Sequence, residues 1–461
     1  MDITRENKDE QNAVLKVQVK PEDYQENVDA VIKDYKKKAK MDGFRQGKVP
    51  EGLIRKMYGR AIKIDEINKV VSQKLNEYIK SEELKILGEP LPSEEDKEKA
   101  INWDYDKEFE FAFDIGLAPE VEVKISKHDK VPYYKITITE DLIEEQKENY
   151  KSRMGEFKDV EQVTDKEELL KADLTELDEN GNVKEEGIFK ENVSLSLSVI
   201  KEEEIKKQFE DAKPEAEIEI DLKKAYPNET ELSSLLEVNK EELSNISDKF
   251  RIFINEIKKF EKAEINQEFF DKLYGEGNVT SEEEFNEKIK EDLQEQFKPE
   301  SERKLHIDIK EHFVRKINPK LPSKFLKRWL KATQQNENLT EDQIDNEFPH
   351  FEEDVKWDLI KNQIIENNEI KVEEQEVLDL AKRLTQQQFQ QYGMMNFPEE
   401  QLEQYAKQLL SNEEQKRKIH DQKYEEKVIE HIKENIKLNE KEVTLEEFKK
   451  QVEGDQNKQS S

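Results

Sequence analysis

The chain has 461 residues, of which 41% are charged and 34% hydrophobic, and its net charge is −33. This length predicts about three domains, and so polar a composition favours an elongated, helix-rich, multidomain protein over one built on a single large core. The acidity argues against general DNA or RNA binding, and the absence of cysteine excludes disulfides. No stretch is apolar enough for a signal peptide or a membrane span, so we expect a cytoplasmic protein without membrane or DNA partners.

The first 116 residues are expected to form a compact α+β domain. Alternating apolar and polar side chains over residues 1–20 predict a hairpin, and a helix begins at Pro21. A second helix is expected from residue 51 to about 84, and alternation over 109–115 predicts a further strand of the same sheet. The apolar stripe of the first helix is expected to consist of Tyr24, Val28, Ile32 and Tyr35.

Between the two helices lies the most specific segment of the chain, residues 43–50, which read G-F-R-Q-G-K-V-P. Gly43 and Gly47 allow positive φ and close backbone approach, and Pro50 suits the first turn of the helix that follows. We therefore expect a compact loop from which the other side chains project.

The projecting side chains have the composition of a binding site. Phe44 would be exposed between charges, as in an interface hot spot, while Arg45 can bind a carboxylate or phosphate through two hydrogen bonds and Lys48 adds a point charge. Residues 36–63 carry ten basic and two acidic side chains, a local net charge of +8, so this segment is a local basic patch whose contacts with a polyanion would weaken as salt rises. The basic residues are Lys36, Lys37, Lys38, Lys40, Arg45, Lys48, Arg55, Lys56, Arg60 and Lys63.

This loop resembles the ribosome-docking signature of trigger factors, bacterial chaperones at the nascent-chain exit, whose pattern is G-F-R-x-G-K-x-P. The resemblance implies a ribosome-binding domain over residues 1–116 that contacts a protein of the large ribosomal subunit and ribosomal RNA beside the exit tunnel. The alternative is a helix–helix turn whose lysines are merely solvated. All fixed positions of the pattern are present, as Gly43, Phe44, Arg45, Gly47, Lys48 and Pro50, with further similarity in Met41-Asp42 and Lys56-Met57-Tyr58-Gly59.

Residues 117–164 are expected to be a connector with few core residues, containing a strand near 131–138 and a helix near 141–154. From 165 to 262 several segments alternate between apolar and polar residues, which predicts a small β-rich domain. By position and strand order this region resembles the FKBP-like prolyl isomerase domain of trigger factors.

The sequence departs from that family where the isomerase pocket would be. The family uses a glycine-containing I-P-G-F-E turn, whereas residues 200–216 read I-K-E-E-E-I-K-K-Q-F-E-D-A-K-P-E-A. We therefore expect isomerase activity to be weak or lost and assign no catalytic residue; an active prolyl isomerase with a divergent pocket is the alternative function. Aromatic residues available as pocket walls, although strand aromatics more often form a core, are Phe189, Phe209, Tyr226, Phe250 and Phe253.

Residues 263–452 are predicted to be helical, and the resemblance implies a substrate-binding domain whose two arms form a cradle for unfolded chains. Residues 386–397 mix glutamine with soft apolar side chains, which is typical of an adaptable surface, although packing on a neighbouring helix is an equal alternative. Residues 453–461 have no apolar side chain and are expected to form a disordered tail. The candidate client-binding residues are Phe389, Tyr392, Met394, Met395 and Phe397.

No cofactor and no metal site are predicted. The Gly-Lys pair of the loop lacks the spacing and the following Ser or Thr of a phosphate-binding loop, and the six histidines are scattered. The favoured function is an ATP-independent chaperone that docks at the ribosomal exit site and shields nascent polypeptides. The resemblance also implies that the free protein can form a homodimer. A third hypothesis is an acidic helical scaffold that never meets the ribosome.

Overall fold

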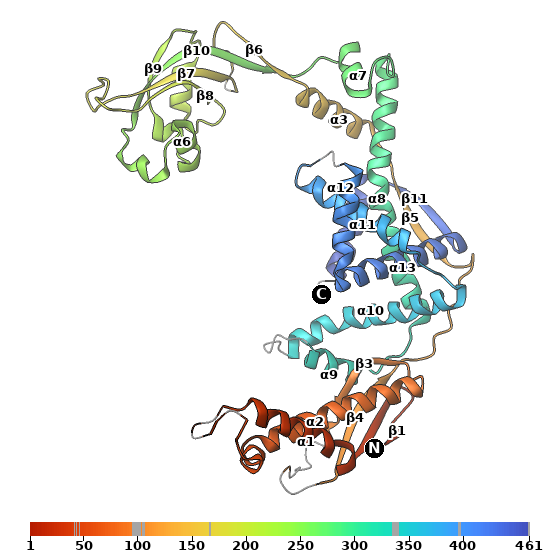
Figure 1. The fold of residues 1–461 in the computed structure, drawn as a ribbon. Helices are drawn as coiled ribbons and strands as arrows, with labels where there is room; N and C mark the ends of the chain where they lie inside the picture. The colour runs from red at the N-terminus through yellow and green to blue at the C-terminus, as the bar shows by residue number, and fades with distance from the viewer. Residues whose placement is uncertain are drawn as a thin grey trace. The chain divides into compact units, whose positions relative to one another are not determined.

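The computed structural model describes residues 1–40, 42, 44–45, 47–94, 103, 107–165, 167–333, 341–394 and 398–459. Two compact units are present: unit 1 contains residues 1–135 and 299–461, and unit 2 contains residues 136–298. Figure 1 shows both, with unit 1 containing the two ends of the chain. Within the described ranges no helix combines the length and the apolar composition that crossing a membrane requires.

The N-terminal part of unit 1 is a four-stranded antiparallel sheet covered by two helices. Its strands are β1 (Asp2–Asn7), β2 (Asn12–Val19), β3 (Ile86–Pro92) and β4 (Phe109–Leu117), in the spatial order β1-β2-β4-β3. The helices are α1 (Pro21–Lys38) and α2 (Glu51–Ser81). Inward-facing residues of β2 and β4 form one core with the buried stripes of both helices. The predicted hairpin, both helices and the later strand are confirmed.

Helices dominate the C-terminal part of unit 1. They are the part of α8 (Glu282–Ile317) from residue 299, α9 (Ser323–Thr333), α10 (Glu341–Asn368), α11 (Glu374–Gln391), α12 (Glu399–Ser411), α13 (Glu413–Asn435) and α14 (Leu445–Gln459). Residues of α8, α10 and α13, among them Phe313, Trp357 and Val428, share one core. Helices α11, α12 and α13 share a second, which includes Ala381 and Ala406. Small residues at these positions let α11 and α12 approach closely.

Two expectations about this part differ from the structure. A strand, β11 (Lys437–Val443), interrupts the helices, because it pairs with β5 (Lys130–Ile136) of the distant connector, a partner that local sequence cannot reveal. Helix α14 extends to Gln459, past the boundary at residue 452 that we expected. It starts with a capping box, in which the Thr444 N–H donates to the Glu447 carboxylate and the Glu447 N–H to the Thr444 hydroxyl, at 2.9 and 3.2 Å.

Helix α9 joins the helical part of unit 1 to the N-terminal sheet. Arg328 donates to the Asp114 carboxylate at 2.7 Å, and Trp329 covers Gly88, where a Cβ atom would lie 2.9 Å from the indole ring. Gly88 also has φ of +74°, so both its backbone conformation and the close approach of Trp329 require glycine.

Unit 2 contains a five-stranded sheet and a separate helical cluster. The strands are β6 (Glu156–Asp159), β7 (Leu169–Glu176), β8 (Phe189–Ser196), β9 (Glu217–Asp221) and β10 (Lys249–Glu261), in the order β6-β10-β7-β8 with β9 also paired to β10. Short helices α4 (Glu203–Lys206), α5 (Leu222–Ala225) and α6 (Glu229–Leu236) complete the β-rich domain. The helical cluster consists of α3 (Glu140–Arg153), α7 (Gln267–Tyr274) and the first part of α8.

The prediction that residues 117–164 contribute little to any core is wrong. Val131 is fully buried in the core of the helical part of unit 1, and Ile138 is buried with Phe269 and Phe285 in unit 2. These apolar residues are too few to show a long periodic pattern, and each is buried by segments distant in sequence, Val131 from β5, which pairs with β11, and Ile138 beyond the end of that strand.

Candidate functional site

The loop between α1 and α2 is held at both ends by backbone hydrogen bonds. The Ala39 N–H donates to the Tyr35 carbonyl at 2.8 Å where α1 ends, and the Lys48 N–H donates to the Arg45 carbonyl at 2.9 Å within the loop. Gly47 has φ of +79°, as the two-glycine pattern predicted, whereas Gly43 lies outside the described residues. Pro50 then precedes the first turn of α2.

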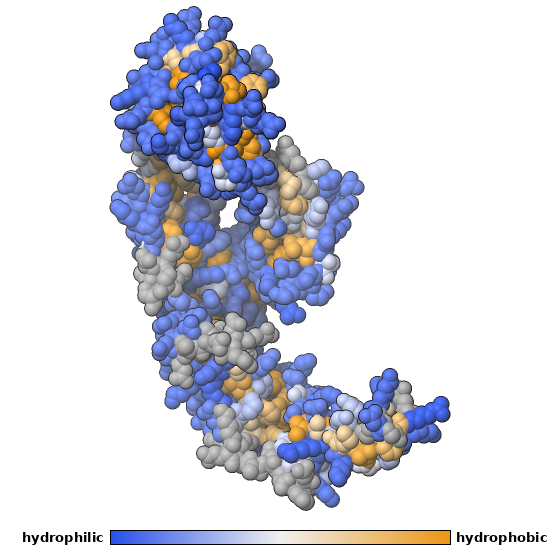
Figure 2. Space-filling model, turned by 90° about the vertical axis from the view of Figure 1, so that its left-hand side faces the viewer, coloured by the Kyte–Doolittle hydropathy of each residue, from blue (hydrophilic) through white to orange (hydrophobic). Residues whose placement is uncertain are grey.

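The loop presents its functional candidates to solvent. Val49 is fully buried and anchors the loop in the N-terminal core, while Phe44 is 41% exposed and Arg45 and Lys48 are also exposed. The exposure that we expected of these three side chains is therefore present. Most of the surface drawn in Figure 2 is hydrophilic, and hydrophobic side chains appear there in separate patches.

The basic residues around the loop fall into two groups. Some are engaged within the domain: Arg55 binds Asp29 and Glu51 at 2.7 and 3.0 Å, and Lys63 donates to the Trp103 carbonyl at 3.0 Å. The hydrogen bond to Asp29 raises the pKa of Arg55. The other group forms no ion pair with any described residue and consists of Lys36, Lys38, Lys40, Arg45, Lys48 and Lys56. These cations have no intramolecular counter-charge in the described chain and remain available to an anionic partner.

Sequence reasoning missed an aromatic pair beside this loop. Tyr35 was expected in the buried stripe of α1, but it is 48% exposed because, in the last turn of the helix, it meets Tyr58 of α2 and not the sheet. The two ring centroids are 5.6 Å apart and the planes are inclined by 37°. Tyr58 is 39% and the neighbouring Met57 54% exposed.

A second exposed apolar group lies where α11 ends. The Met394 N–H donates to the Phe389 carbonyl and the Gly393 N–H to the Gln390 carbonyl, both at 3.0 Å, and Gly393 has φ of +79°. This is the Schellman arrangement that closes a helix with glycine in the left-handed conformation. It leaves Tyr392 and Met394 71% and 45% exposed.

The other candidates in this segment behave differently. Phe389 is half-buried, and its ring packs edge-on against Tyr405 of α12 with centroids 5.2 Å apart. Tyr405 is itself exposed and was not anticipated from the sequence. Met395 and Phe397 lie outside the described residues. Phe389 therefore packs on a neighbouring helix, whereas Tyr392 and Met394 face solvent, and client binding by this segment stays a prediction.

In the β-rich domain most of the candidate pocket aromatics form the core. Phe209 and Phe250 are fully buried, and Phe189 is exposed. Tyr226 is buried and donates its hydroxyl to the Ser196 carbonyl at 3.1 Å, and burial raises its pKa. A cavity of about 720 Å³ lies between β8 and α6, and Tyr226 is the single aromatic side chain among its lining residues. The five aromatics therefore do not surround one cavity.

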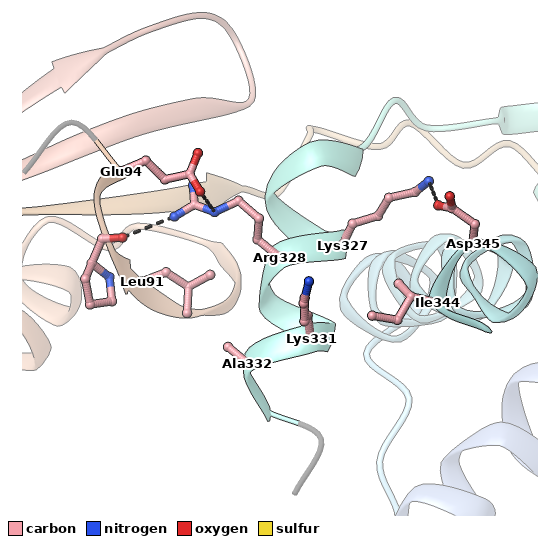
Figure 3. A pocket seen from close by; sticks show the side chains of 9 residues that line it. Leu91, Glu94, Lys327, Arg328, Lys331, Ala332, Ile344 and Asp345 are labelled. Atoms are coloured by element: carbon pink, nitrogen blue, oxygen red, sulfur yellow. Dashed lines mark hydrogen bonds and ion pairs between the residues drawn. The ribbon is translucent and has the colours of Figure 1, made fainter. Parts of the chain in front are cut away.

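A further cleft of about 640 Å³ lies where α9 meets the end of β3 and the start of α10. Figure 3 shows Leu91 and Ile344 among its walls and charged side chains along α9. Lys327 binds Asp345 at 2.5 Å, and Arg328 lies 3.7 Å from Glu94. These cations already have carboxylate partners. Among the described residues no group of three or more side chains is arranged to hold a metal ion.

Three family models match this chain in succession. They are described as bacterial trigger factor protein over residues 1–150, probable trigger factor, FKBP-like domain over 157–262, and probable trigger factor, C-terminal domain over 301–452. The chain belongs to the trigger factor family. The recognition made from the loop signature is thereby confirmed, as is the multidomain α+β fold class with an FKBP-like domain and a helical C-terminal region.

Individual trigger factors are similar along most of the chain. That of Francisella tularensis subsp. tularensis is 26% identical over 397 residues, which are 84% of this chain and 86% of the relative. That of Pelagibacter ubique is 27% identical over 470 aligned positions, 98% of this chain and 89% of the relative. A solved trigger factor chaperone, described for promiscuous substrate recognition in folding and assembly, has a TM-score of 0.54 at 15% identity and covers 94% of this chain and 99% of its own. That likeness supports the fold.

Proposed function

We propose that this protein is an ATP-independent chaperone of the bacterial cytoplasm that docks at the exit site of the large ribosomal subunit and shields nascent polypeptides. The observation that carries the proposal is the loop between α1 and α2, where Phe44, Arg45 and Lys48 are exposed together and four neighbouring lysines, like Arg45 and Lys48 themselves, lack a described counter-charge. An aromatic anchor beside unpaired cations suits a protein-and-RNA surface. The family adds the expectation that the free protein forms a homodimer, which sedimentation velocity tests.

Clients would be held by the arm formed by α11 and α12. Tyr392, Met394 and Tyr405 are exposed there, and amide side chains surround them along the glutamine-rich end of α11. Soft and amphipathic side chains contact many sequences weakly, and a client leaves when folding buries the apolar surface that it had exposed. In this proposal Phe389 supports the surface by packing on Tyr405.

Co-sedimentation with ribosomes at increasing salt tests docking. The Phe44→Ala/Arg45→Ala/Lys48→Ala variant is expected to lose binding that the native chain shows at low salt. A control with the same change in charge and aromatic content, Phe189→Ala/Lys201→Ala/Lys213→Ala in the β-rich domain, should bind like the native chain. Equal sedimentation of all three proteins would refute docking through the loop.

Suppression of aggregation by an unfolding client tests the arm. Tyr392→Ser/Met394→Ser/Tyr405→Ser should require a several-fold higher chaperone concentration than the native chain. The control Phe157→Ser/Val183→Ser/Phe189→Ser removes three exposed apolar side chains from unit 2 and should change little. If the control is impaired as strongly as the arm variant, the arm is not the principal client surface.

We also infer that prolyl isomerase activity is weak or absent. Catalysis of this isomerisation needs a dry aromatic cavity that holds the peptide bond twisted against a barrier of about 18–20 kcal/mol. Here Phe209 and Phe250 are core residues and the Tyr226 hydroxyl is bound to the Ser196 carbonyl. A proline-containing test peptide that isomerises no faster with the protein than without it would support the inference, and clear acceleration would refute it.

A further inference from the structure

The aromatic pair beside the loop is not explained by packing alone. Tyr35 and Tyr58 contact each other, yet each ring keeps over a third of its surface in solvent. Neither hydroxyl forms a hydrogen bond with a described residue. Elsewhere in the same domain, Tyr24 is buried and donates its hydroxyl to the Lys107 carbonyl at 3.0 Å. The pair therefore presents two aromatic faces and two free polar groups to a partner.

The charges around the pair indicate which partner. Tyr35 precedes Lys36, Lys38 and Lys40 at the end of α1, and Tyr58 follows Lys56 in the second turn of α2. None of these lysines forms an ion pair with a described residue. Other exposed lysines of this acidic chain do bind glutamate or aspartate, as Lys74 binds Glu77. Aromatic faces set among unneutralised cations complement a polyanion that carries flat rings, which is the chemistry of RNA.

The geometry favours an unpaired base over a duplex. In double-stranded RNA the base faces are stacked inside the helix, and a side chain reaches only phosphates, sugars and base edges. An unpaired base can instead lie on an aromatic ring, and such stacking tolerates any base because each has a π-face. Tyr35 is 48% and Tyr58 39% exposed, so a base can reach the pair from solvent. The exposed Met57 extends the same apolar surface.

We propose that Tyr35 and Tyr58 form a stacking platform for an unpaired base of ribosomal RNA, while Lys36, Lys38, Lys40 and Lys56 bind the flanking phosphates. The inference rests on the proposed docking function. It extends that function by assigning specific residues to the contact with ribosomal RNA. Phe44, Arg45 and Lys48 then remain available for the neighbouring surface.

The first test measures ribosome binding by the full-length protein at one fixed salt concentration. Tyr35→Leu/Tyr58→Leu keeps apolar contact between the helices but removes the π-faces, and should weaken binding about tenfold, which is 1.4 kcal/mol. The slope of affinity against salt should not change, since the phosphate contacts remain. Tyr35→Phe/Tyr58→Phe keeps the rings and should bind like the native chain. Tyr392→Leu, an exposed tyrosine on the arm, is the matched control and should have no effect on ribosome binding.

The second test uses a short single-stranded RNA that contains 2-aminopurine, whose fluorescence falls when the base stacks. The native chain should quench it and the leucine variant should not, and a fully paired RNA of equal charge should bind both proteins equally. Circular dichroism establishes that the variants are folded. If the leucine variant binds ribosomes as tightly as the native chain, the proposal is wrong and the pair is only a packing contact between α1 and α2. Weakened ribosome binding without any quenching by the native chain would assign the pair to a ribosomal protein and overturn the RNA assignment.

These results also separate the two proposals. If the native chain does not sediment with ribosomes, docking fails, and the quenching experiment alone decides whether the platform binds RNA. If the native chain sediments and the loop variant does not, docking stands whatever the tyrosine variants show. A phenylalanine variant as weak as the leucine variant would mean that the hydroxyls, and not the ring faces, make the contact.

Discussion

The segment around the loop between α1 and α2 and the FKBP-like domain use aromatic residues in opposite ways. In the loop segment Tyr35, Phe44 and Tyr58 are exposed, whereas Tyr24 and Phe109 of the same domain are buried in its core. In the FKBP-like domain Phe209 and Phe250, which could have lined a substrate pocket, are fully buried. Exposure has a cost in water that a partner must offset, whereas burial stabilises the domain by itself. The comparison teaches that aromatic residues left exposed are candidates for contact with a partner, whereas buried ones are explained by the stability of their domain.

The largest effect is expected for a substitution in the core of the FKBP-like domain. Phe250→Ala should destabilise the FKBP-like domain by about 3–5 kcal/mol, because it leaves a cavity among fully buried side chains. Hydrogen exchange of β7 and β10 in the full chain measures this loss. Phe253→Ala, on the same strand but half-buried, should cost much less. Ribosome binding should not change in either variant, and its loss on Phe250→Ala would show that the two regions are not independent.

The loop should show the reverse pattern. Phe44→Ala should change the free energy of unfolding by less than about 0.5 kcal/mol, since the side chain is exposed, yet weaken ribosome binding by about 2 kcal/mol, roughly 30-fold. Calorimetry and co-sedimentation measure the two quantities. Phe189→Ala removes another exposed phenylalanine and should change neither the free energy of unfolding nor ribosome binding. If it weakened ribosome binding as much as Phe44→Ala does, the effect would not be specific to the loop.

The buried carboxylate of Glu176 is a second feature that stabilises the FKBP-like domain. Burial alone would raise the pKa of Glu176, but Lys184 and the backbone N–H groups of Ser247 and Ile188, at 2.7 and 2.8 Å, hold this pKa below its usual value. The lowered pKa means that the carboxylate stabilises the domain above its unfolded pKa of about 4.3, and that this stability is lost as the pH falls through the folded pKa.

Glu176→Gln should therefore destabilise the FKBP-like domain by about 2 kcal/mol at neutral pH and flatten its acid dependence below about pH 4.3. Denaturant unfolding of the full chain, followed by exchange in β7 over a pH series, measures both effects. Glu219→Gln changes a carboxylate that is 52% exposed and bound to Arg251, and should have little effect. An unchanged pH dependence in the Glu176 variant would contradict this account.

The smallest effect should come from Tyr226→Phe. It removes the hydrogen bond to the Ser196 carbonyl while keeping the buried ring, and should cost about 1 kcal/mol of stability. Because we infer that the ring belongs to the core and not to a catalytic pocket, isomerisation of a proline peptide should proceed at the same rate with either protein. A slower rate with the variant would place Tyr226 in a working isomerase site.

Much of the architecture was readable from short-range patterns. The alternation in β2 and β4 and the apolar stripes of α1 and α2 gave the N-terminal domain, because one buried face imposes a period of two or of 3.6 on the sequence. The loop was readable because turn geometry restricts which residues are tolerated, and Gly47 adopts the positive φ that the pattern required.

What local patterns could not give were partners distant in sequence. Strand β11 has little alternation and forms because β5 lies beside it, and the connector is buried because cores built by other helices receive it. A contact between distant segments also explains Tyr35. Its place in the apolar stripe predicted burial, but at the end of α1 its ring meets Tyr58 of α2. The sequence by itself therefore determined most helices and strands and the glycine-containing loop at residues 43–50. The tertiary structure decided which rings face solvent and which cations stay unpaired, because these depend on contacts between segments that no local period encodes.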